Sequence, residues 1–167
     1  YTSLATQTVS VTTSDDDTAS FTLSGTTATV SETGTTATFT AVLGAQPSSD
    51  VVLSVVSADT GEATVSPAQL TFTSGNWNAA QTVTVTGIDD SLIDGDQVTT
   101  VTVSIVDASS DNNFDPLADQ TVTVTTSDDE TGSFTLSGTT ATVSEAGTPA
   151  PCTSVTVSET GTTTTFT

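Results

Sequence analysis

The chain has 167 residues, of which 20 are Asp or Glu; it has no Lys, Arg or His, and its formal net charge is -20. This composition excludes a nucleic-acid partner and attraction to anionic membranes, because no basic side chain is present to meet a phosphate. Thr is the most frequent residue and is accompanied by much Val and Ser, a mixture that favours strands over helices. We therefore expect an all-β protein. No apolar run approaches the roughly 18 residues of a membrane helix, so we expect no direct membrane insertion.

Alternating apolar and polar residues, bounded by turn residues, mark the strands of the central part of the chain. A proline cannot donate to a strand ladder, so Pro67 suits an edge strand or a change of sheet. The pattern predicts a seven-stranded antiparallel Greek-key sandwich of the immunoglobulin-like type. Its apolar positions in chain order are Phe21 and Leu23, Ala28 and Val30, Ala37 to Leu43, Val51 to Val56, Ala63 to Val65, Leu70 and Phe72, Val83 and Val85, Val101 to Ile105, and Val122 and Val124.

A long internal repeat sets the predicted domain boundaries. Residues 4–17 return almost unchanged as residues 117–130, about 113 residues later, and this period is the size of one sandwich domain. The sequence therefore predicts a slice of a tandem array. Its expected parts are the last strand of a preceding repeat at 1–17, a complete repeat at 18–130, and the first strands of a following, incomplete repeat at 131–167.

The last part of the chain departs from the repeat. Residues 146–160 contain an insertion or local duplication, and Val157-Ser158-Glu159 in this segment is a second copy of the motif Val30-Ser31-Glu32. Cys152 is the only cysteine, which excludes an intrachain disulfide. We interpret it as a free thiol, with a bond to another chain as the alternative.

Acidic residues gather where the predicted strands end. Alternate loops of an antiparallel sandwich emerge at the same end, so these groups are expected to meet at one pole. Adjacent aspartates in a regular strand would point to opposite faces, so the Asp-Asp pairs must lie where strand geometry stops. The groups are Glu32, then Asp59 with Glu62, then Asp89, Asp90, Asp94 and Asp96, and finally Asp128, Asp129 and Glu130.

The chain has no cation of its own to neutralise such a pole. Two carboxylates about 4 Å apart repel by roughly 4 kcal/mol at an effective dielectric constant of about 20. The pole must bind protons or metal, and a hard cation, Ca²⁺ before Mg²⁺, suits oxygen ligands. The alternative is that the acidic loops are solvated edges that oppose aggregation. We interpret the remaining acids of the loops as ordinary solvated turn residues: Asp50, Asp107, Asp111, Asp115 and Asp119.

The ordered motifs of the central unit resemble the Calx-beta repeat, a family of immunoglobulin-like sandwiches. The motifs are Val30-Ser31-Glu32, the strand at 82–86 leading into Asp89-Asp90 and Asp94-Gly95-Asp96, and the closing Asp128-Asp129-Glu130. Gln97 departs from the pattern, because the family commonly has an acid there. The Thr-rich, Lys-free composition is similar to the versions in large bacterial surface proteins. The resemblance implies Ca²⁺ ligands at Glu32, Asp59, Asp89, Asp90, Asp94, Asp96, Asp128, Asp129 and Glu130.

The expected function is structural. Catalysis is disfavoured, because no imidazole or amine is present to activate a Ser or Cys nucleophile. We expect a non-catalytic extracellular or cell-surface module that builds a calcium-stiffened fibre, filament or adhesin stalk. Its expected partners are neighbouring copies or repeats of the same protein, in a homopolymer or tandem array, including by strand donation.

The alternative function is a ligand-binding adhesion module for a glycan or for ice. Rows of Thr-x-Thr and the single Trp77 favour it. Twisted sandwich sheets seldom offer the flat surface that ice needs. A Trp between a turn and a strand is more often a lid on the core than a platform for sugar.

Overall fold

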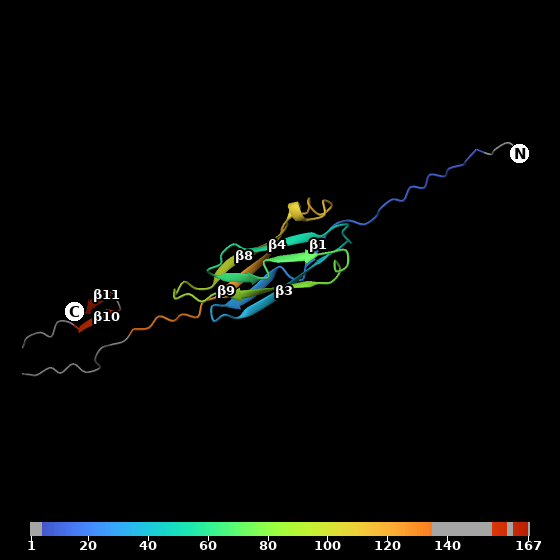
Figure 1. Ribbon diagram of the computed structural model, residues 1–167. Coiled ribbons are helices and arrows are strands. Elements are labelled where there is room, and N and C mark those ends of the chain that lie inside the picture. Colours follow the sequence, from blue (N-terminus) through green and yellow to red (C-terminus); the bar gives the residue numbers. More distant parts are fainter. Residues whose placement is uncertain (1–4, 135–154, 160–161, 167) are drawn as a thin grey trace, which may run out of the picture. The chain divides into compact units, whose positions relative to one another are not determined.

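The structure is a computed structural model that describes residues 5–134, 155–159 and 162–166 (Figure 1). The chain divides into two compact units, Tyr1–Asp129 and Glu130–Thr167. The described residues of the first unit form one short 3-10 helix, η1 (Asp107–Ser109), and nine strands. The strands are β1 (Phe21–Leu23), β2 (Thr27–Ser31), β3 (Thr36–Leu43), β4 (Val51–Ser57), β5 (Ala63–Ser66), β6 (Gln69–Phe72), β7 (Gln81–Gly87), β8 (Gln97–Ile105) and β9 (Gln120–Ser127).

The nine strands form two sheets. One has the order β1-β3-β7-β5 and the other the order β2-β9-β8-β4-β6. Neighbouring strands are antiparallel except for β2 and β9, which run parallel. The first order matches the A-B-E-D sheet of an immunoglobulin domain, and β4-β8-β9 matches its C-F-G sheet. The expected all-β, two-sheet, immunoglobulin-like sandwich is confirmed.

The described residues of the first unit form nine strands where seven were expected, one for each of the nine apolar runs of the sequence. The two runs on either side of Gly25 are separate strands, of which β1 pairs in one sheet and β2 in the other. The two runs on either side of Pro67 are β5 and β6, which are edge strands of opposite sheets. Proline lacks the N–H that a continued ladder needs, so the predicted change of sheet at Pro67 is confirmed.

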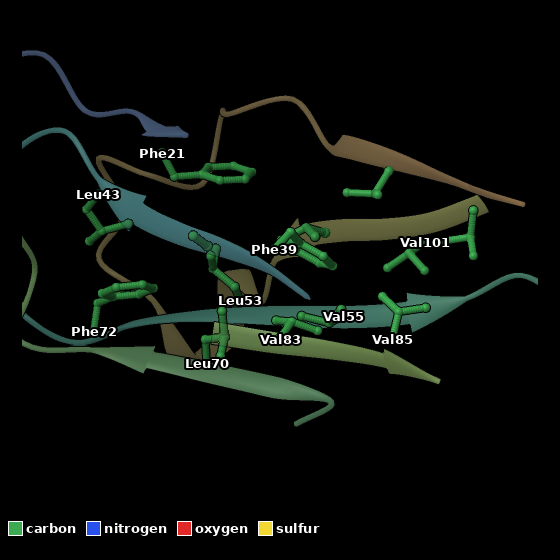
Figure 2. Packing of buried hydrophobic residues seen from close by; sticks show 14 of the residues in the cluster. Phe21, Phe39, Leu43, Leu53, Val55, Leu70, Phe72, Val83, Val85 and Val101 are labelled. Atoms are coloured by element: carbon green, nitrogen blue, oxygen red, sulfur yellow. The ribbon is translucent and has the colours of Figure 1, made fainter. Parts of the chain in front are cut away.

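The core lies between the two sheets and follows the predicted alternation. In β4, Val51, Leu53 and Val55 are buried, while the residues between them face outward. Figure 2 shows Phe39, Leu53 and Val83 among the side chains that fill the space between the strands. Each buried aliphatic or aromatic side chain of this kind stabilises the fold by about 1.5–3 kcal/mol. Trp77 is partly buried against this core, as expected of a lid.

The N-terminal residues of the first unit lie outside both sheets. Residues 5–20 form no strand, and the tail extends from β1 in blue in Figure 1. Val9 and Val11 are 87% and 83% exposed there. Among the described residues, no helix combines the length and apolarity that a membrane span requires.

The second unit contains a described hairpin. Strand β10 (Val155–Glu159) pairs antiparallel with β11 (Thr162–Phe166), with Val155 opposite Phe166. The segment 135–154, which carries Cys152 and most of the expected opening strands of a following repeat, lies outside the described residues.

Candidate metal centre

Glu62 is held at one end of the sandwich by contacts from both sheets. It precedes β5, and its carbonyl accepts hydrogen bonds from the Ile88 N–H at 2.9 Å and from the Thr126 hydroxyl at 3.2 Å. Ile88 directly follows β7 in the four-stranded sheet, and Thr126 is a fully buried residue of β9 in the other. These two bonds fix where the Glu62 side chain begins.

Glu32 approaches the same end from β2, and Gly87 allows the next loop to cover it. Glu32 is 1% exposed, and its N–H donates to the Ser127 carbonyl at 3.1 Å. A Cβ on Gly87 would overlap the Ser31 carbonyl, so only glycine permits this approach of β7 to the end of β2. The Gly87 N–H also donates to the Thr35 carbonyl at 3.1 Å. The acidic loop that follows Gly87 therefore starts beside Glu32.

Asp90 lies at the centre of the acidic group. One carboxylate oxygen from each of Glu62, Asp90 and Asp94 lies within 4.8 Å of the other two, and an oxygen of Glu32 lies within 4.8 Å of one on Asp90. The Asp-Asp pairs stand where β7 and β9 have ended, as predicted. We call Glu32, Glu62, Asp90 and Asp94 the acidic pole.

The loop at 88–96 is folded by its own hydrogen bonds and by Asp128. The Leu92 N–H donates to Asp90 Oδ1 at 2.6 Å. Gly95 has φ of +77°, a left-handed conformation that favours glycine, and its N–H donates to Asp128 Oδ2 at 2.8 Å. Asp128 therefore ties the loop to the residues that follow β9.

The surroundings of Glu62 disfavour the ionised form of its carboxyl. Burial raises the pKa of the Glu62 carboxyl above its ordinary value, and the negative charges of Asp94, Asp59 and Asp90 raise it further. Its Oε2 atom is buried and has no hydrogen-bond partner among the described residues. Since the chain has no basic side chain, the charge of Glu62 can be neutralised only by a proton or by a cation from outside.

The residues of the acidic pole fit a hard divalent cation. Ca²⁺ binds six to eight oxygens at about 2.3–2.6 Å, so two of its ligands are separated by no more than about 5 Å. The 4.8 Å limit on the oxygens of Glu62, Asp90 and Asp94 meets this condition. All the side chains of the acidic pole are carboxylates. Hard cations such as Ca²⁺ and Mg²⁺ prefer these oxygen ligands, whereas softer metals prefer nitrogen and sulfur ligands.

The predicted ligands do not all meet. Glu32, Asp90 and Asp94 belong to the acidic pole, while Asp89 lies within 4.8 Å of Asp129 in a separate, exposed pair. Glu130 is the first residue of the second unit. The others are placed as follows: Asp59 is exposed and accepts from the Gly61 N–H at 2.9 Å, Asp96 is exposed immediately before β8, and Asp128 binds Gly95.

Glu62 belongs to the acidic pole but was not among the predicted ligands. It shares a loop with Asp59, and that adjacency was the available signal in the sequence. Which of the two turns inward depends on contacts made by distant residues. The Asp59 N–H is held by the Thr99 hydroxyl at 3.1 Å, and the Glu62 carbonyl by Ile88 and Thr126.

The interpretation of Asp111 as a solvated turn residue is wrong. Asp111 is 4% exposed, and its Oδ2 accepts hydrogen bonds from the Ser48 N–H at 2.7 Å, the Ser48 hydroxyl at 2.6 Å and the Ser49 N–H at 3.2 Å. Its Oδ1 accepts from the Asn113 N–H at 3.0 Å. The Ser48 hydroxyl, followed by these backbone donors, lowers the Asp111 pKa to about 2 against the opposing effect of burial. Of the other acids interpreted in this way, three are exposed and one is half-buried: Asp50, Asp107 and Asp119, and Asp115.

Comparison with known proteins assigns no family. No protein-family model and no curated protein matches the chain. Solved structures with a similar fold include PapD-like domain 7 of human CEP192, at 12% identity and a TM-score of 0.49, covering 77% of this chain and 99% of that one.

Two further solved structures are similar at the same level. One is SSP-19 of Caenorhabditis elegans, a member of a family like the MSP-domain proteins, at 19% identity and a TM-score of 0.42, covering 64% of this chain and 96% of that one. The other is the E. coli chaperone DraB, at 7% identity and a TM-score of 0.47, covering 66% of this chain and 55% of that one. At such scores these likenesses carry no conclusion about function, and the assignment of the fold rests on the strand order described above.

Proposed function

We propose that the chain is a non-catalytic structural module of an extracellular or cell-surface array, and that Ca²⁺ bound at the acidic pole stiffens it. The observation that carries this proposal is the convergence of Glu62, Asp90 and Asp94, with one buried carboxylate oxygen left without a donor. A divalent cation there would replace repulsion between carboxylates with attraction to a shared charge.

The residues that would hold the ion come from two loops and one strand end. Glu32, Glu62, Asp90 and Asp94 would supply carboxylate oxygens, with water completing the shell of six to eight oxygens. Asp59 would add negative field from outside the shell, since its charge already acts on Glu62. The bound ion would cross-link loops that connect to strands of both sheets.

A role without catalysis agrees with the chemistry of the acidic pole. Its members are all carboxylates, and the chain has no His, Lys or Arg to act as a partner for a nucleophile. The exposed faces of the strands carry mostly Thr and Ser, which suits a module that is solvated on the outside.

The proposal includes a tandem array of Calx-beta-like Greek-key repeats, with neighbouring repeats or copies as partners. Its support is the return of residues 4–17 as 117–130 and of residues 20–32 as 133–145. In the first unit, residues 20–32 include β1 and β2, and residues 117–130 include β9. The repeated stretches therefore correspond to the first and last strands of one sandwich.

Thermal melting of the full chain with Ca²⁺ and with excess chelator tests the metal part of the proposal. At a free concentration a hundred times the Kd, binding to the folded state adds about 2.7 kcal/mol to the free energy of unfolding. We expect a higher melting temperature and slower proteolysis of the loop at 88–96 in Ca²⁺. The E62Q variant should lose most of this response, while D50N, at an exposed acid outside the acidic pole, should keep it. Equal melting temperatures in Ca²⁺ and in chelator would refute the calcium site.

A further inference from the structure

Asp94-Gly95 is the one place in the chain where glycine directly follows Asp or Asn. At such a pair the main-chain nitrogen of the glycine can attack the carboxyl carbon of the aspartate and close a succinimide ring. Glycine permits this attack because it has no side chain to obstruct the ring. Asp94 and Gly95 are both exposed, and a Cβ placed on Gly95 would meet no atom within 4 Å. The ring therefore has room to form, and water can reach it.

The carboxyl of Asp94 accepts no hydrogen bond from a described residue, unlike the carboxyls of three other loop aspartates. Asp59, Asp90 and Asp111 each accept through Oδ1 from the N–H two residues later, at 2.9, 2.6 and 3.0 Å. A turn of this kind holds the carboxyl toward that N–H and away from the nitrogen of the next residue. Because Asp94 lacks this restraint, its carboxyl carbon can turn toward the Gly95 nitrogen.

The Gly95 nitrogen faces a proton acceptor. Its N–H donates to Asp128 Oδ2 at 2.8 Å, which is within the distance over which a carboxylate can act as a general base. The amide must give up this proton as its nitrogen attacks the carboxyl carbon. Asp128, which follows β9, therefore lies where the base of this reaction has to be.

We propose that Asp94 converts spontaneously to isoaspartate, with Asp128 as the base. Asp128 takes the proton of the Gly95 N–H, and the nitrogen forms a bond to the carboxyl carbon of Asp94. The hydroxyl of the protonated Asp94 carboxyl takes up that proton and leaves as water. Water then adds to the main-chain carbonyl of the succinimide and breaks its bond to the Gly95 nitrogen, so that the chain continues through the former side chain. The water released balances the water consumed, and no oxidant or reductant is needed.

The modification would act on the acidic pole, and in this respect the inference rests on the proposed function. In isoaspartate the free carboxylate is attached directly to Cα, while the main chain is longer by one carbon. The Asp94 oxygen that lies within 4.8 Å of oxygens on Glu62 and Asp90 would therefore leave that position. A bound cation would in turn hold the Asp94 carboxylate away from the Gly95 nitrogen. Without Ca²⁺ the acidic pole would lose a ligand with time, and with Ca²⁺ it would keep that ligand.

Incubation of the full chain in chelator at neutral pH tests the reaction, with isoaspartate located by peptide mapping and electron-transfer mass spectrometry. We expect isoaspartate to accumulate at Asp94 but not at Asp90, whose carboxyl is held by the Leu92 N–H. This comparison lies within one loop of the wild-type chain and needs no variant. Equal accumulation at Asp94 and Asp90 would overturn the proposal.

The role of Asp128 is tested by D128N, which keeps an oxygen able to accept from the Gly95 N–H but is a poor base. We expect the rate at Asp94 to fall by about tenfold or more. D129N, at the adjacent exposed acid, is the matched control and should react as the wild type does. Circular dichroism of both variants checks that the sandwich is intact. A folded D128N chain that reacts as fast as the wild type would overturn the assignment of the base.

Repeating the incubation in Ca²⁺ separates this inference from the calcium site. At a free concentration a hundred times the Kd, the fraction of chains without the ion falls about a hundredfold, and the rate at Asp94 should fall with it. If isoaspartate accumulates in chelator and Ca²⁺ does not slow it, the modification stands and the calcium site fails. If Ca²⁺ binds but Asp94 forms no more isoaspartate than Asp90 in chelator, the modification is overturned and the calcium site stands.

Discussion

Asp111 and Glu62 are carboxylates folded into loops of the same sandwich, and their surroundings are opposite. Asp111 accepts four hydrogen bonds from Ser48, Ser49 and Asn113, and its pKa is lowered to about 2. The pKa of Glu62 is raised by burial and by neighbouring Asp charges, and its buried oxygen has no donor among the described residues. The fold itself satisfies the charge of Asp111, whereas Glu62 needs a proton or a cation from outside.

The difference separates an acid whose charge the fold satisfies from an acid whose charge it leaves unsatisfied, in a chain where every charged side chain is negative. A carboxylate that gathers N–H and O–H donors stabilises the fold in its ionised form. A carboxylate that gathers other carboxylates stabilises the fold only when something shared between them is bound. Substitutions at the two places should therefore change stability in opposite directions.

Removing Asp111 should have the largest effect. D111A leaves the Ser48 and Ser49 donors without their acceptor, and we expect the free energy of unfolding to fall by about 3 kcal/mol. Urea denaturation should show the same loss in Ca²⁺ and in chelator. D107A, at an exposed acid in η1, is the matched control and should change stability by less than about 0.5 kcal/mol. A loss that disappears in Ca²⁺ would mean that Asp111 acts through the metal.

Lowering the pH should remove part of the stabilisation that Asp111 provides, without any substitution. The pKa of Asp111 is lowered from 3.8 to about 2, so its contribution is present above the unfolded value and is lost as the pH falls from about 4 through about 2. The expected loss is about 2 kcal/mol. Comparing the pH dependence of unfolding for the wild type and D111N checks this, since D111N should lack that component.

A substitution at Gly87, where β7 lies against the end of β2, should lower the free energy of unfolding by nearly as much. G87A places a methyl group against the Ser31 carbonyl, which forces β7 and the acidic loop away from Glu32. We expect a loss of about 2 kcal/mol together with a weaker response to Ca²⁺. G75A is the control, because a Cβ there would meet only the Thr73 hydroxyl at 3.7 Å. Equal Ca²⁺ responses in G87A and G75A would show that the approach of β7 does not position the site.

Substitution of Glu62 should raise the free energy of unfolding, whereas the substitutions above lower it. E62Q removes a buried charge that its neighbours disfavour, and we expect the metal-free protein to become more stable by about 1 kcal/mol at neutral pH. The advantage should shrink as the pH falls through the raised pKa, because wild-type Glu62 is then protonated in the folded state. Urea denaturation of both proteins in chelator at neutral and acidic pH measures this. Destabilisation by E62Q in chelator would contradict the account of the acidic pole.

The regular elements could be predicted because their signal is periodic. Alternation identified the inward residues of β4 and β7, and Pro67 marked the change of sheet between β5 and β6. The ends of strands were predicted well enough to place Asp89-Asp90 beyond β7 and Asp128-Asp129 beyond β9. The alternation of apolar and polar residues also shows where each strand ends. Because most residues of the acidic pole lie just beyond strand ends, their positions could be predicted from the same pattern.

Contacts between loops could not be predicted in this way, because loops have no period. Asp111 finds Ser48 and Ser49 more than sixty residues earlier in the chain, and nothing local distinguishes it from the exposed Asp107. Pairing partners are also not local. Val30-Ser31 lies in β2, which pairs with β9, whereas the repeated Val157-Ser158 lies in β10 and pairs with β11 as a hairpin. The same short sequence therefore pairs with different strands in the two units, depending on which strand lies beside it.

Calcium titration of the full chain by calorimetry, in two buffers of different ionisation enthalpy, tests the central claim most directly. We expect saturable binding with a Kd of about 10⁻⁴–10⁻³ M or tighter, and a proton release that grows as the pH is lowered, because the raised pKa of Glu62 leaves more of this carboxyl protonated there. E62Q should weaken binding at least tenfold and lose the proton release, while D50N should match the wild type. Absence of saturable binding, or equal binding by E62Q and the wild type, would contradict a metal centre at the acidic pole.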